Sequence, residues 1–169
     1  VGAALATVPR NHLFISSMTS PCVHGAPPSR NVTDPDACFN LTLAEAYSTI
    51  SQLKSGYLDL LMLHGPSEPF GHVGPCGVLA CMLNAAQWRA YDFLLRAGVV
   101  RAIGVSNFCS SCLSCLRDER VGGESMPLPA VNQIQVHVGM GPDPQGLLSL
   151  CASQGIVVQA YEPLAGGEG

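Results

Sequence analysis

The sequence predicts an α/β fold, a partial (β/α)8 TIM barrel with about five parallel strands and intervening helices. Short apolar runs alternate along the chain with stretches in which apolar residues recur at helical spacing. Glycine stands where these helical stretches would end, at Gly56, Gly98 and Gly155. The run at 57–63 is nearly all apolar instead of alternating, which is typical of parallel strands covered on both faces.

The strands and helices can be assigned in order. Strands are predicted at residues 13–17, 57–63, 99–105, 130–137 and 156–160. Helices are expected at residues 43–53, 88–96, 109–117 and 144–154. The stretches 20–37, 65–77 and 121–129 are predicted to be loops, because proline, glycine and polar residues gather there. Residues 1–5 resemble the tail of a helix and the chain stops shortly after a strand, so both ends are expected to be truncations.

Strands and helices in this order can form two kinds of sheet. One is an open, doubly wound sheet, and the other is a (β/α)8 barrel, which takes about 250 residues. No Gly-x-Gly-x-x-Gly turn follows any predicted strand, so a Rossmann nucleotide site has no support. We favour barrel strands, of which this chain of 169 residues holds five of eight.

Charged residues are sparse. They make up 12% of the chain, the net charge is -4, and Lys and Arg form no cluster. Nucleic acids and anionic membranes are therefore not expected as partners. No apolar run reaches the roughly 20 residues that a membrane-spanning helix needs. Because no secretory leader opens the sequence, we expect a cytoplasmic protein.

The eight cysteines show no paired spacing, so reduced thiols are expected. Cys109, Cys112 and Cys115 are spaced like the start of an iron–sulfur ligand run, but the fourth cysteine of such a run is missing. We therefore predict no metal site and ordinary packed or exposed thiols.

Polar side chains stand at the carboxyl ends of four successive predicted strands, where barrel proteins carry their functional groups. In strand order they are His64, then Ser106 and Asn107, then Gln133, Gln135 and His137, and finally Tyr161. Taken singly, each is most simply a hydrogen-bonded or packed structural residue. Four such positions in register predict a ligand site, because buried polar groups need partners.

The segments around these residues resemble signatures of the aldo-keto reductase family, in the same order and at matching spacing. They are residues 57–66, 98–108, 130–137 and 155–164, while 14–17 is similar to the family's third strand and 88–96 to the helix before its Gly-x-x-Arg-x-Ile-Gly strand. The likeness runs from the family's third strand to its seventh. Residues 1–169 are therefore interpreted as a single incomplete aldo-keto reductase barrel domain.

The resemblance implies NADPH-dependent reduction of the carbonyl of a small molecule to an alcohol. In the family a Tyr, whose pKa is tuned by a Lys and an Asp, donates the proton, and a His orients the carbonyl. His64 matches that His. Ser106, Asn107 and Gln133 match the residues that hydrogen-bond the nicotinamide carboxamide of NADP(H). Tyr161 matches the aromatic residue that stacks on the nicotinamide ring.

The sequence also departs from the family. Met18 stands at the position of the catalytic Lys. The units that carry the family's Asp and Tyr, and the segment after its eighth strand that holds the 2′-phosphate, have no counterpart among these residues. Gln135 replaces the usual Glu, and Val138 replaces the usual Pro. Asp59 lies inside the second predicted strand and is expected to be a hydrogen-bonding core residue, not the catalytic Asp.

Two functional hypotheses follow. The chain is an incomplete or inactive part of an NADPH-dependent carbonyl reductase, or it is a degenerate, non-catalytic family member with a nucleotide-binding or protein-interaction surface. An arc of five strands also has two edges, and strands that are apolar on both faces would expose a contiguous apolar surface. We therefore expect the isolated chain to aggregate, or to associate with a second copy or a chaperone.

Overall fold

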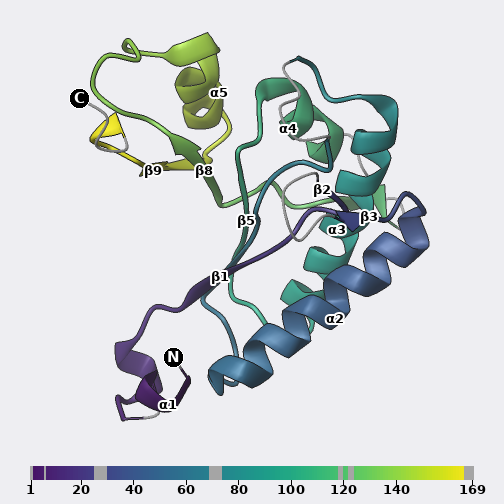
Figure 1. The fold of residues 1–169 in the computed structure, drawn as a ribbon, viewed down its shortest axis with the longest axis vertical. Helices are drawn as coiled ribbons and strands as arrows, with labels where there is room; N and C mark the ends of the chain where they lie inside the picture. Colours follow the sequence, from purple (N-terminus) through teal and green to yellow (C-terminus); the bar gives the residue numbers. More distant parts are fainter. Residues whose placement is uncertain are drawn as a thin grey trace.

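The computed structural model describes residues 2–5, 7–24, 30–68, 74–117, 120–121 and 124–165. Its centre is a sheet of five parallel strands in the order β1-β4-β5-β8-β9 (Figure 1). The strands are β1 Ser16–Thr19, β4 Leu60–Leu63, β5 Ile103–Ser106, β8 Val131–Gln135 and β9 Val157–Tyr161. The strand order follows the chain order, as in an arc of a barrel, whereas the order reverses in a doubly wound sheet. The predicted fold class is confirmed.

Helices connect successive strands of this sheet (Figure 1). They are α2 Pro35–Leu53, α3 Val78–Arg96, α4 Ser110–Arg117 and α5 Leu147–Ser153, preceded by the short α1 Gly2–Leu5. Two 3₁₀ turns, η1 Arg10–His12 and η2 Pro144–Gly146, precede β1 and α5. None of the described helices is long and apolar enough to cross a membrane.

Two helices begin earlier than the sequence predicted. In α2 the side chain of Asp34 accepts a hydrogen bond of 2.8 Å from the backbone N–H of Ala37, and Pro35 occupies the first turn. Both are favoured at a helix start, although this segment was predicted to be loop. Lys54, with a φ of 53°, ends α2 in the left-handed conformation. α3 begins at Val78, well before the predicted start at residue 88.

Two short antiparallel pairs lie in regions that were predicted to be loops. β2 Val23–His24 pairs with β3 Arg30–Asn31, and β6 Arg120–Val121 pairs with β7 Glu124–Ser125. Strands of two residues are too short to show an alternating pattern, so the sequence gives no signal for them.

The core lies between the sheet and the helices. Alternate residues of β4 and β5, such as Leu61 and Val105, are buried there together with Trp88 and Tyr91 of α3. Complete burial of one such apolar side chain contributes about 1.5–3 kcal/mol to folding. The hydroxyl of Tyr91 is satisfied by Thr19 of β1, at 2.9 Å. Helix α3 is therefore fixed against the strands that end at the predicted site.

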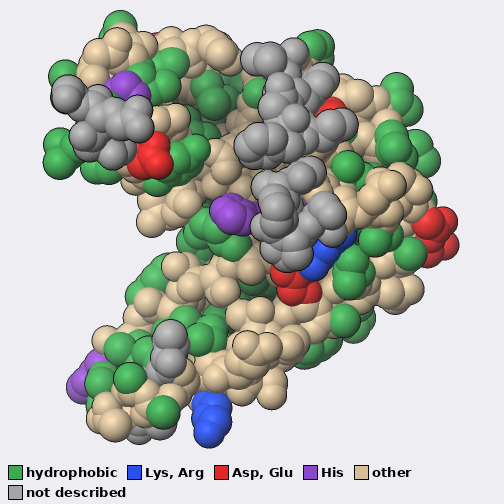
Figure 2. Space-filling view, viewed as in Figure 1, with side chains coloured by type: hydrophobic (Ala, Val, Ile, Leu, Met, Phe, Trp, Pro, Cys, Tyr) green, Lys and Arg blue, Asp and Glu red, His purple; other side chains and the backbone are tan. Residues whose placement is uncertain are grey.

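The other face of the strands is directed toward the interior of the barrel arc. Figure 2 shows a hollow on this side, between the part with β8, β9 and α5 and the part around α1. Leu60 and Met62 of β4 are nevertheless buried, so the expectation that this strand exposes an apolar face was wrong. Gly104 is in register with Met62 and leaves room for that side chain, because a Cβ at Gly104 would lie 3.1 Å from Cγ of Met62. Val157 of β9, by contrast, is 61% exposed.

The cysteines differ from the sequence prediction. Disulfides join Cys22 to Cys38, Cys76 to Cys112 and Cys81 to Cys115, whereas Cys109 and Cys151 are free. The expectation of reduced thiols was therefore wrong for six of the eight. The partners lie 16, 36 and 34 residues apart and come from different elements, so linear spacing does not reveal them.

Candidate functional site

Four of the predicted site residues lie together at the carboxyl ends of three neighbouring strands. Ser106 ends β5 and Asn107 follows it, Gln133 belongs to β8, and Tyr161 ends β9. Ser106 is in register with Gln133 across the β5–β8 pair. Carboxyl ends of adjacent parallel strands meet at one edge of a sheet, so residues far apart in sequence become neighbours here.

Asn107 is the centre of this cluster. Its Nδ2 donates to the backbone carbonyl of His64 at 3.0 Å and to Oγ of Ser106 at 3.1 Å. Its Oδ1 accepts a hydrogen bond of 2.8 Å from the hydroxyl of Tyr161. Its backbone N–H donates to the carbonyl of Gln133 at 2.8 Å. An amide bound at both its nitrogen and its oxygen is held in one orientation.

The backbone at Asn107 turns sharply away from the strand. Its φ is 60°, a left-handed conformation that Asn adopts more readily than most residues other than glycine. Ser106, which is buried, donates from its hydroxyl to the carbonyl of Gln133 at 3.0 Å. The turn after β5 is thus fastened to β8, and the Asn107 side chain stays at the strand ends.

Gln133 keeps hydrogen-bonding capacity for a ligand. Its Nε2 donates to Oε1 of Gln159 on β9 at 3.1 Å. An amide nitrogen carries a second hydrogen, and no described residue donates to Oε1 of Gln133. Farther along the same strand, Gln135 donates to Glu162 at 3.0 Å. Gln133 can therefore offer a donor and an acceptor to another amide.

Tyr161 is half-buried, and its hydroxyl is a poor acid. Burial first, and then the neighbouring carboxylate of Glu162, raise the pKa of the Tyr161 hydroxyl above its ordinary value. The hydroxyl therefore stays protonated at neutral pH and donates to Asn107. The sequence predicted a ring that stacks on nicotinamide, and it did not reveal this hydrogen bond.

His64 follows β4 directly and is exposed. Its backbone N–H donates to the carbonyl of Thr19 at 2.9 Å, and its carbonyl accepts from Asn107. The main chain of His64 is therefore fixed on both sides, between β1 and β5, while the imidazole remains open to a ligand.

Met18 lies on β1, in register with Met62 of β4. It is half-buried at the position that the resemblance assigns to a lysine. A thioether carries no charge and donates no hydrogen bond, so it cannot lower the pKa of a nearby hydroxyl as an ammonium group does.

A buried polar network holds the loop after His64, and no sequence pattern indicated it. The backbone N–H of Ser67 donates to Oδ1 of Asn84 at 2.8 Å, and its hydroxyl donates to Oε1 of Gln87 at 2.9 Å. Gln87 in turn donates to the carbonyl of Ser20 at 3.0 Å. Both amides lie on α3 and are completely buried, so the helix positions the loops after β1 and β4.

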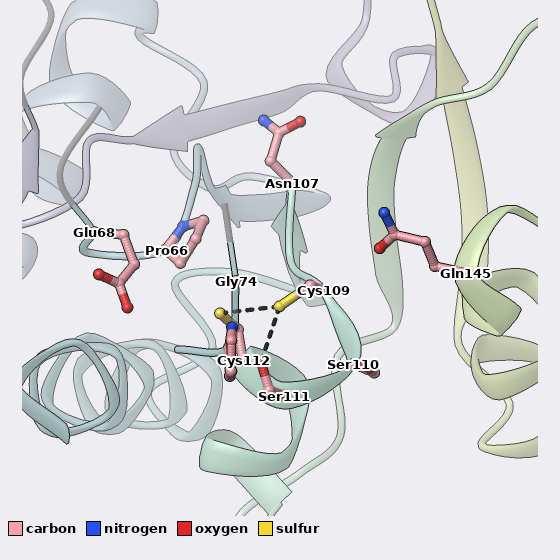
Figure 3. Close-up of a pocket in the computed structure, with 10 residues that line it drawn as sticks. Pro66, Glu68, Gly74, Asn107, Cys109, Ser110, Ser111, Cys112 and Gln145 are labelled. Carbon is pink, nitrogen blue, oxygen red and sulfur yellow. Dashed lines mark hydrogen bonds between the residues drawn. The ribbon is translucent and has the colours of Figure 1, made fainter. Parts of the chain in front are cut away.

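A cavity of about 510 Å³ opens beside the cluster. Among the residues that line it are Pro66, Glu68, Asn107, Cys109, Ser111 and Gln145 (Figure 3). Asn107 therefore belongs both to the polar cluster and to this cavity. Sequence reasoning missed the cavity because its walls come from loops and from the start of α4, which carry no strand-end signal.

Asp59 lies away from this site, in the segment that leads into β4. Its carboxylate accepts from the backbone N–H of Ile15 at 2.8 Å and from Arg10 at 2.7 Å. Burial alone would raise the pKa of Asp59, but these two hydrogen bonds and the charge of Arg10 outweigh it and lower the pKa. The prediction of a hydrogen-bonding core residue is confirmed. In the described ranges, no group of three or more His, Cys, Asp or Glu residues could hold a metal ion.

The chain is similar in sequence to curated reductases. The NAD/NADP-dependent indole-3-acetaldehyde reductase of Schizosaccharomyces pombe is 31% identical over 167 residues, which are 98% of this chain and 49% of that protein. The glyoxal reductase of Bacillus subtilis is 29% identical over 169 residues, 99% of this chain and 49% of that protein. The chain thus spans about half the length of the curated relatives that it matches.

Solved structures share the fold. An aldo/keto reductase from Brucella melitensis superposes with a TM-score of 0.72 at 23% identity, over 98% of this chain and 53% of that one. An aldo-keto reductase from Bombyx mori, solved in complex with NADP, superposes with a TM-score of 0.65 at 22% identity, over 95% of this chain and 45% of that one. The model of the Aldo/keto reductase family matches residues 1–168. The chain therefore belongs to the aldo/keto reductase family.

Proposed function

We propose that this chain forms the nicotinamide end of an NADP(H) site and carries the carbonyl-orienting histidine of a reductase for small aldehydes or ketones. We further propose that residues 1–169 alone do not catalyse the reduction. The observation that carries this proposal is the cluster in which Asn107 binds Tyr161, Ser106 and the carbonyl of His64. These groups lie at the end of the sheet where barrel proteins act on their ligands.

The residues present fit a carboxamide. Gln133 has a free amide hydrogen and acceptor oxygen, and Oδ1 of Asn107 has a second lone pair beyond the one that binds Tyr161. The ring of Tyr161 provides a flat face for a heteroaromatic ring. NADPH, when bound, supplies a hydride for the carbonyl carbon. His64, exposed at the end of β4, would orient the carbonyl oxygen through its imidazole.

Reduction also needs a proton donor, and none of the described residues at the site is a suitable one. Met18 stands where the resemblance expects the lysine that activates the acid. Tyr161 does not substitute for that acid, because its pKa is raised and its proton is engaged with Asn107. The cluster can therefore hold and orient groups, but it cannot protonate the alkoxide that hydride transfer produces.

Binding of the cofactor is expected to be weak. The four residues reach only the nicotinamide end, whereas phosphate groups usually contribute much of the affinity through charged partners. The family's 2′-phosphate site follows its eighth strand, a segment with no counterpart in residues 1–169. Calorimetric titration with NADPH should therefore show no tight site. A submicromolar dissociation constant would overturn this part of the proposal.

A second candidate function is a non-catalytic family member with a nucleotide-binding or protein-interaction surface. Met18 favours it, because a complete reductase would need the lysine. The coding sequence upstream of Val1 distinguishes the reductase from the non-catalytic protein. Two further βα units with the catalytic Asp and Tyr would favour the reductase, whereas a stop codon directly before Val1 would favour the non-catalytic protein.

A further inference from the structure

We propose that Cys76, Cys109 and Cys112 form a thiol–disulfide exchange site on the wall of the cavity, in which the free thiol moves between Cys109 and Cys76. Cys76 and Cys112 are joined by a disulfide. Sγ of the free Cys109 lies 3.4 Å from Sγ of Cys112 (Figure 3). A third sulfur thus lies beside a disulfide, and this arrangement is independent of the proposed reductase function.

Helix α4 brings two of the sulfurs together. Cys109 directly precedes α4, and Cys112 lies in its first turn. A separation of three residues places both side chains on the same side of a helix start. Cys76 comes from the segment that leads into α3, two residues before that helix begins at Val78. Its backbone N–H donates to Oγ of Ser111 at 3.0 Å, which ties the starts of the two helices together beside the sulfurs.

The exchange is balanced without an outside oxidant or reductant. The thiolate of Cys109 attacks Sγ of Cys112, which is the usual first step of thiol–disulfide exchange. A Cys109–Cys112 bond forms while the Cys76–Cys112 bond breaks, and the electron pair leaves on Cys76. The proton that Cys109 loses is matched by one that Cys76 takes up. One disulfide and one thiol are present before and after.

Each of the two sulfurs that carry the charge has a hydrogen-bonding neighbour. Oγ of Ser111 lies 3.1 Å from Sγ of Cys109. Because this oxygen already accepts the N–H of Cys76, its own hydrogen is free to point at the sulfur. On the other side, Nδ2 of Asn84 donates to Sγ of Cys76 at 3.7 Å. Attack and departure are therefore both supported, and the exchange can run in either direction.

The two forms differ at the wall of the cavity. In the Cys76–Cys112 form, the segment with Gly74 and Pro75 is tied to α4, and both residues line the cavity with Cys109. In the Cys109–Cys112 form this tie is lost, although Cys81–Cys115 still joins α3 to α4. The exchange therefore changes how the wall formed by Gly74 and Pro75 is held.

Differential alkylation tests the exchange. The full chain, purified without reductant, is equilibrated at mildly alkaline pH and then denatured at mildly acidic pH, where exchange is slow, with excess N-ethylmaleimide. The remaining cysteines are then reduced and alkylated with iodoacetamide, and tandem mass spectrometry locates both labels. We expect the maleimide to be divided between Cys109 and Cys76. Maleimide on Cys109 but not on Cys76 would overturn the proposal, as would full labelling of Cys76, Cys109 and Cys112 together.

Variants make the test specific. Cys109→Ser removes the attacking sulfur, so Cys76 should lose its maleimide label completely; Cys109→Ala provides the same test if the serine variant does not fold. Cys151→Ser is the matched control, because Cys151 is also a free cysteine but is buried on α5. That variant should leave the division between Cys109 and Cys76 unchanged. Persistent labelling of Cys76 in the Cys109 variants would show that its bridge opens by another route and would overturn the proposal.

Discussion

The hydroxyl of Tyr161 donates a 2.8 Å hydrogen bond to the side-chain oxygen of Asn107, 54 residues away in the chain. Tyr161 ends β9 and Asn107 follows β5, and the two strands are not neighbours, because β8 lies between them. The bond therefore crosses the end of β8 and links the three strands that carry the predicted cofactor residues. The ends of β5 and β9 are thus held together by a side-chain contact that does not depend on strand pairing.

The first prediction concerns turnover. The wild-type chain, mixed with NADPH and nitrobenzaldehyde, should show no loss of nicotinamide absorbance above that of buffer. Met18→Lys should be equally inactive, because it adds an ammonium group to β1 without adding the hydroxyl acid that this group would tune. Clear turnover by the wild-type chain that His64→Ala abolishes would contradict the proposal of an inactive chain.

The second prediction concerns the close packing at Gly104. A Cβ at Gly104 would lie 2.9 Å from the backbone carbonyl of Val131, a contact that a rotamer change cannot relieve. Gly104→Ala should therefore destabilise the chain by about 1–3 kcal/mol, the usual cost of overpacking. Gly65→Ala is the control, since nothing lies within 4 Å of its added Cβ. Circular dichroism during heating measures the unfolding midpoint of each variant. Equal midpoints for Gly104→Ala and Gly65→Ala would refute the close packing at Gly104.

The third prediction concerns acid stability. The folded-state pKa of Asp59 lies below its unfolded value of about 3.9, so its ionised form stabilises the fold above that pH. This contribution is lost as the pH falls through the folded-state pKa. Asp59→Asn should lower the free energy of unfolding at neutral pH by about 1.5–3 kcal/mol, the usual range for hydrogen bonds to charged groups.

Urea unfolding of the wild type and of Asp59→Asn across the acid range measures this effect. The difference between the two proteins should be full at neutral pH and should shrink as the pH falls below about 3.9. Asp36→Asn, a change at an exposed position in the first turn of α2, is the control and should cost no more than about 0.3–1 kcal/mol, the usual contribution of a first-turn carboxylate. A difference that is independent of pH would show that the charge of Asp59 does not carry the effect.

The fourth prediction concerns association through the sheet edge. β9 is an end strand of the five-stranded sheet, and Val157 on it is 61% exposed. A charge on an edge strand opposes pairing with another chain, so Val157→Lys should raise the monomer fraction. Val78→Lys is the control, because Val78 is 81% exposed but lies at the start of α3. Chromatography with light scattering measures the monomer fraction of each protein. A stable, monodisperse wild-type monomer would contradict the expected association.

The order of the strands could be predicted because buried parallel strands leave continuous apolar runs, as in β4. The meeting of Ser106, Asn107 and Tyr161 was predictable for a related reason: each follows or ends a strand, and parallel strands bring those ends together. Gln133 lies within β8, in register with Ser106. Only the resemblance assigned their roles, because an amide or a ring at a strand end does not by itself specify a ligand.

Other features depend on tertiary geometry that leaves no linear pattern. Met62 is buried beside Gly104, which leaves room for its side chain, so the apolar face of β4 is covered although the sequence suggested exposure. The bond between Tyr161 and Asn107 depends on the left-handed backbone at Asn107. The pairing of Cys76 with Cys112 depends on how α4 packs beside α3, and neither helix shows its partner in its own sequence.

The fifth prediction concerns ligand binding at the strand ends. If the ring of Tyr161 stacks on nicotinamide, Tyr161→Ala should abolish binding of reduced nicotinamide mononucleotide, whereas Tyr161→Phe, which keeps the ring, should retain it. Gln135→Ala is the control, because Gln135 is bound to Glu162 and lies outside the Asn107 cluster. Equal losses in the Phe and Ala variants would assign the binding to the hydroxyl instead of the ring.

Saturation-transfer difference NMR on the wild-type chain is the most direct test of the nicotinamide site. Reduced nicotinamide mononucleotide and adenosine 2′,5′-bisphosphate are added separately at equal concentration. We predict saturation transfer to the nicotinamide protons and none to the adenine protons. The transfer to nicotinamide should be lost in Tyr161→Ala. Transfer to adenine alone, or to neither ligand, would contradict the claim that these strand ends form the nicotinamide end of the site.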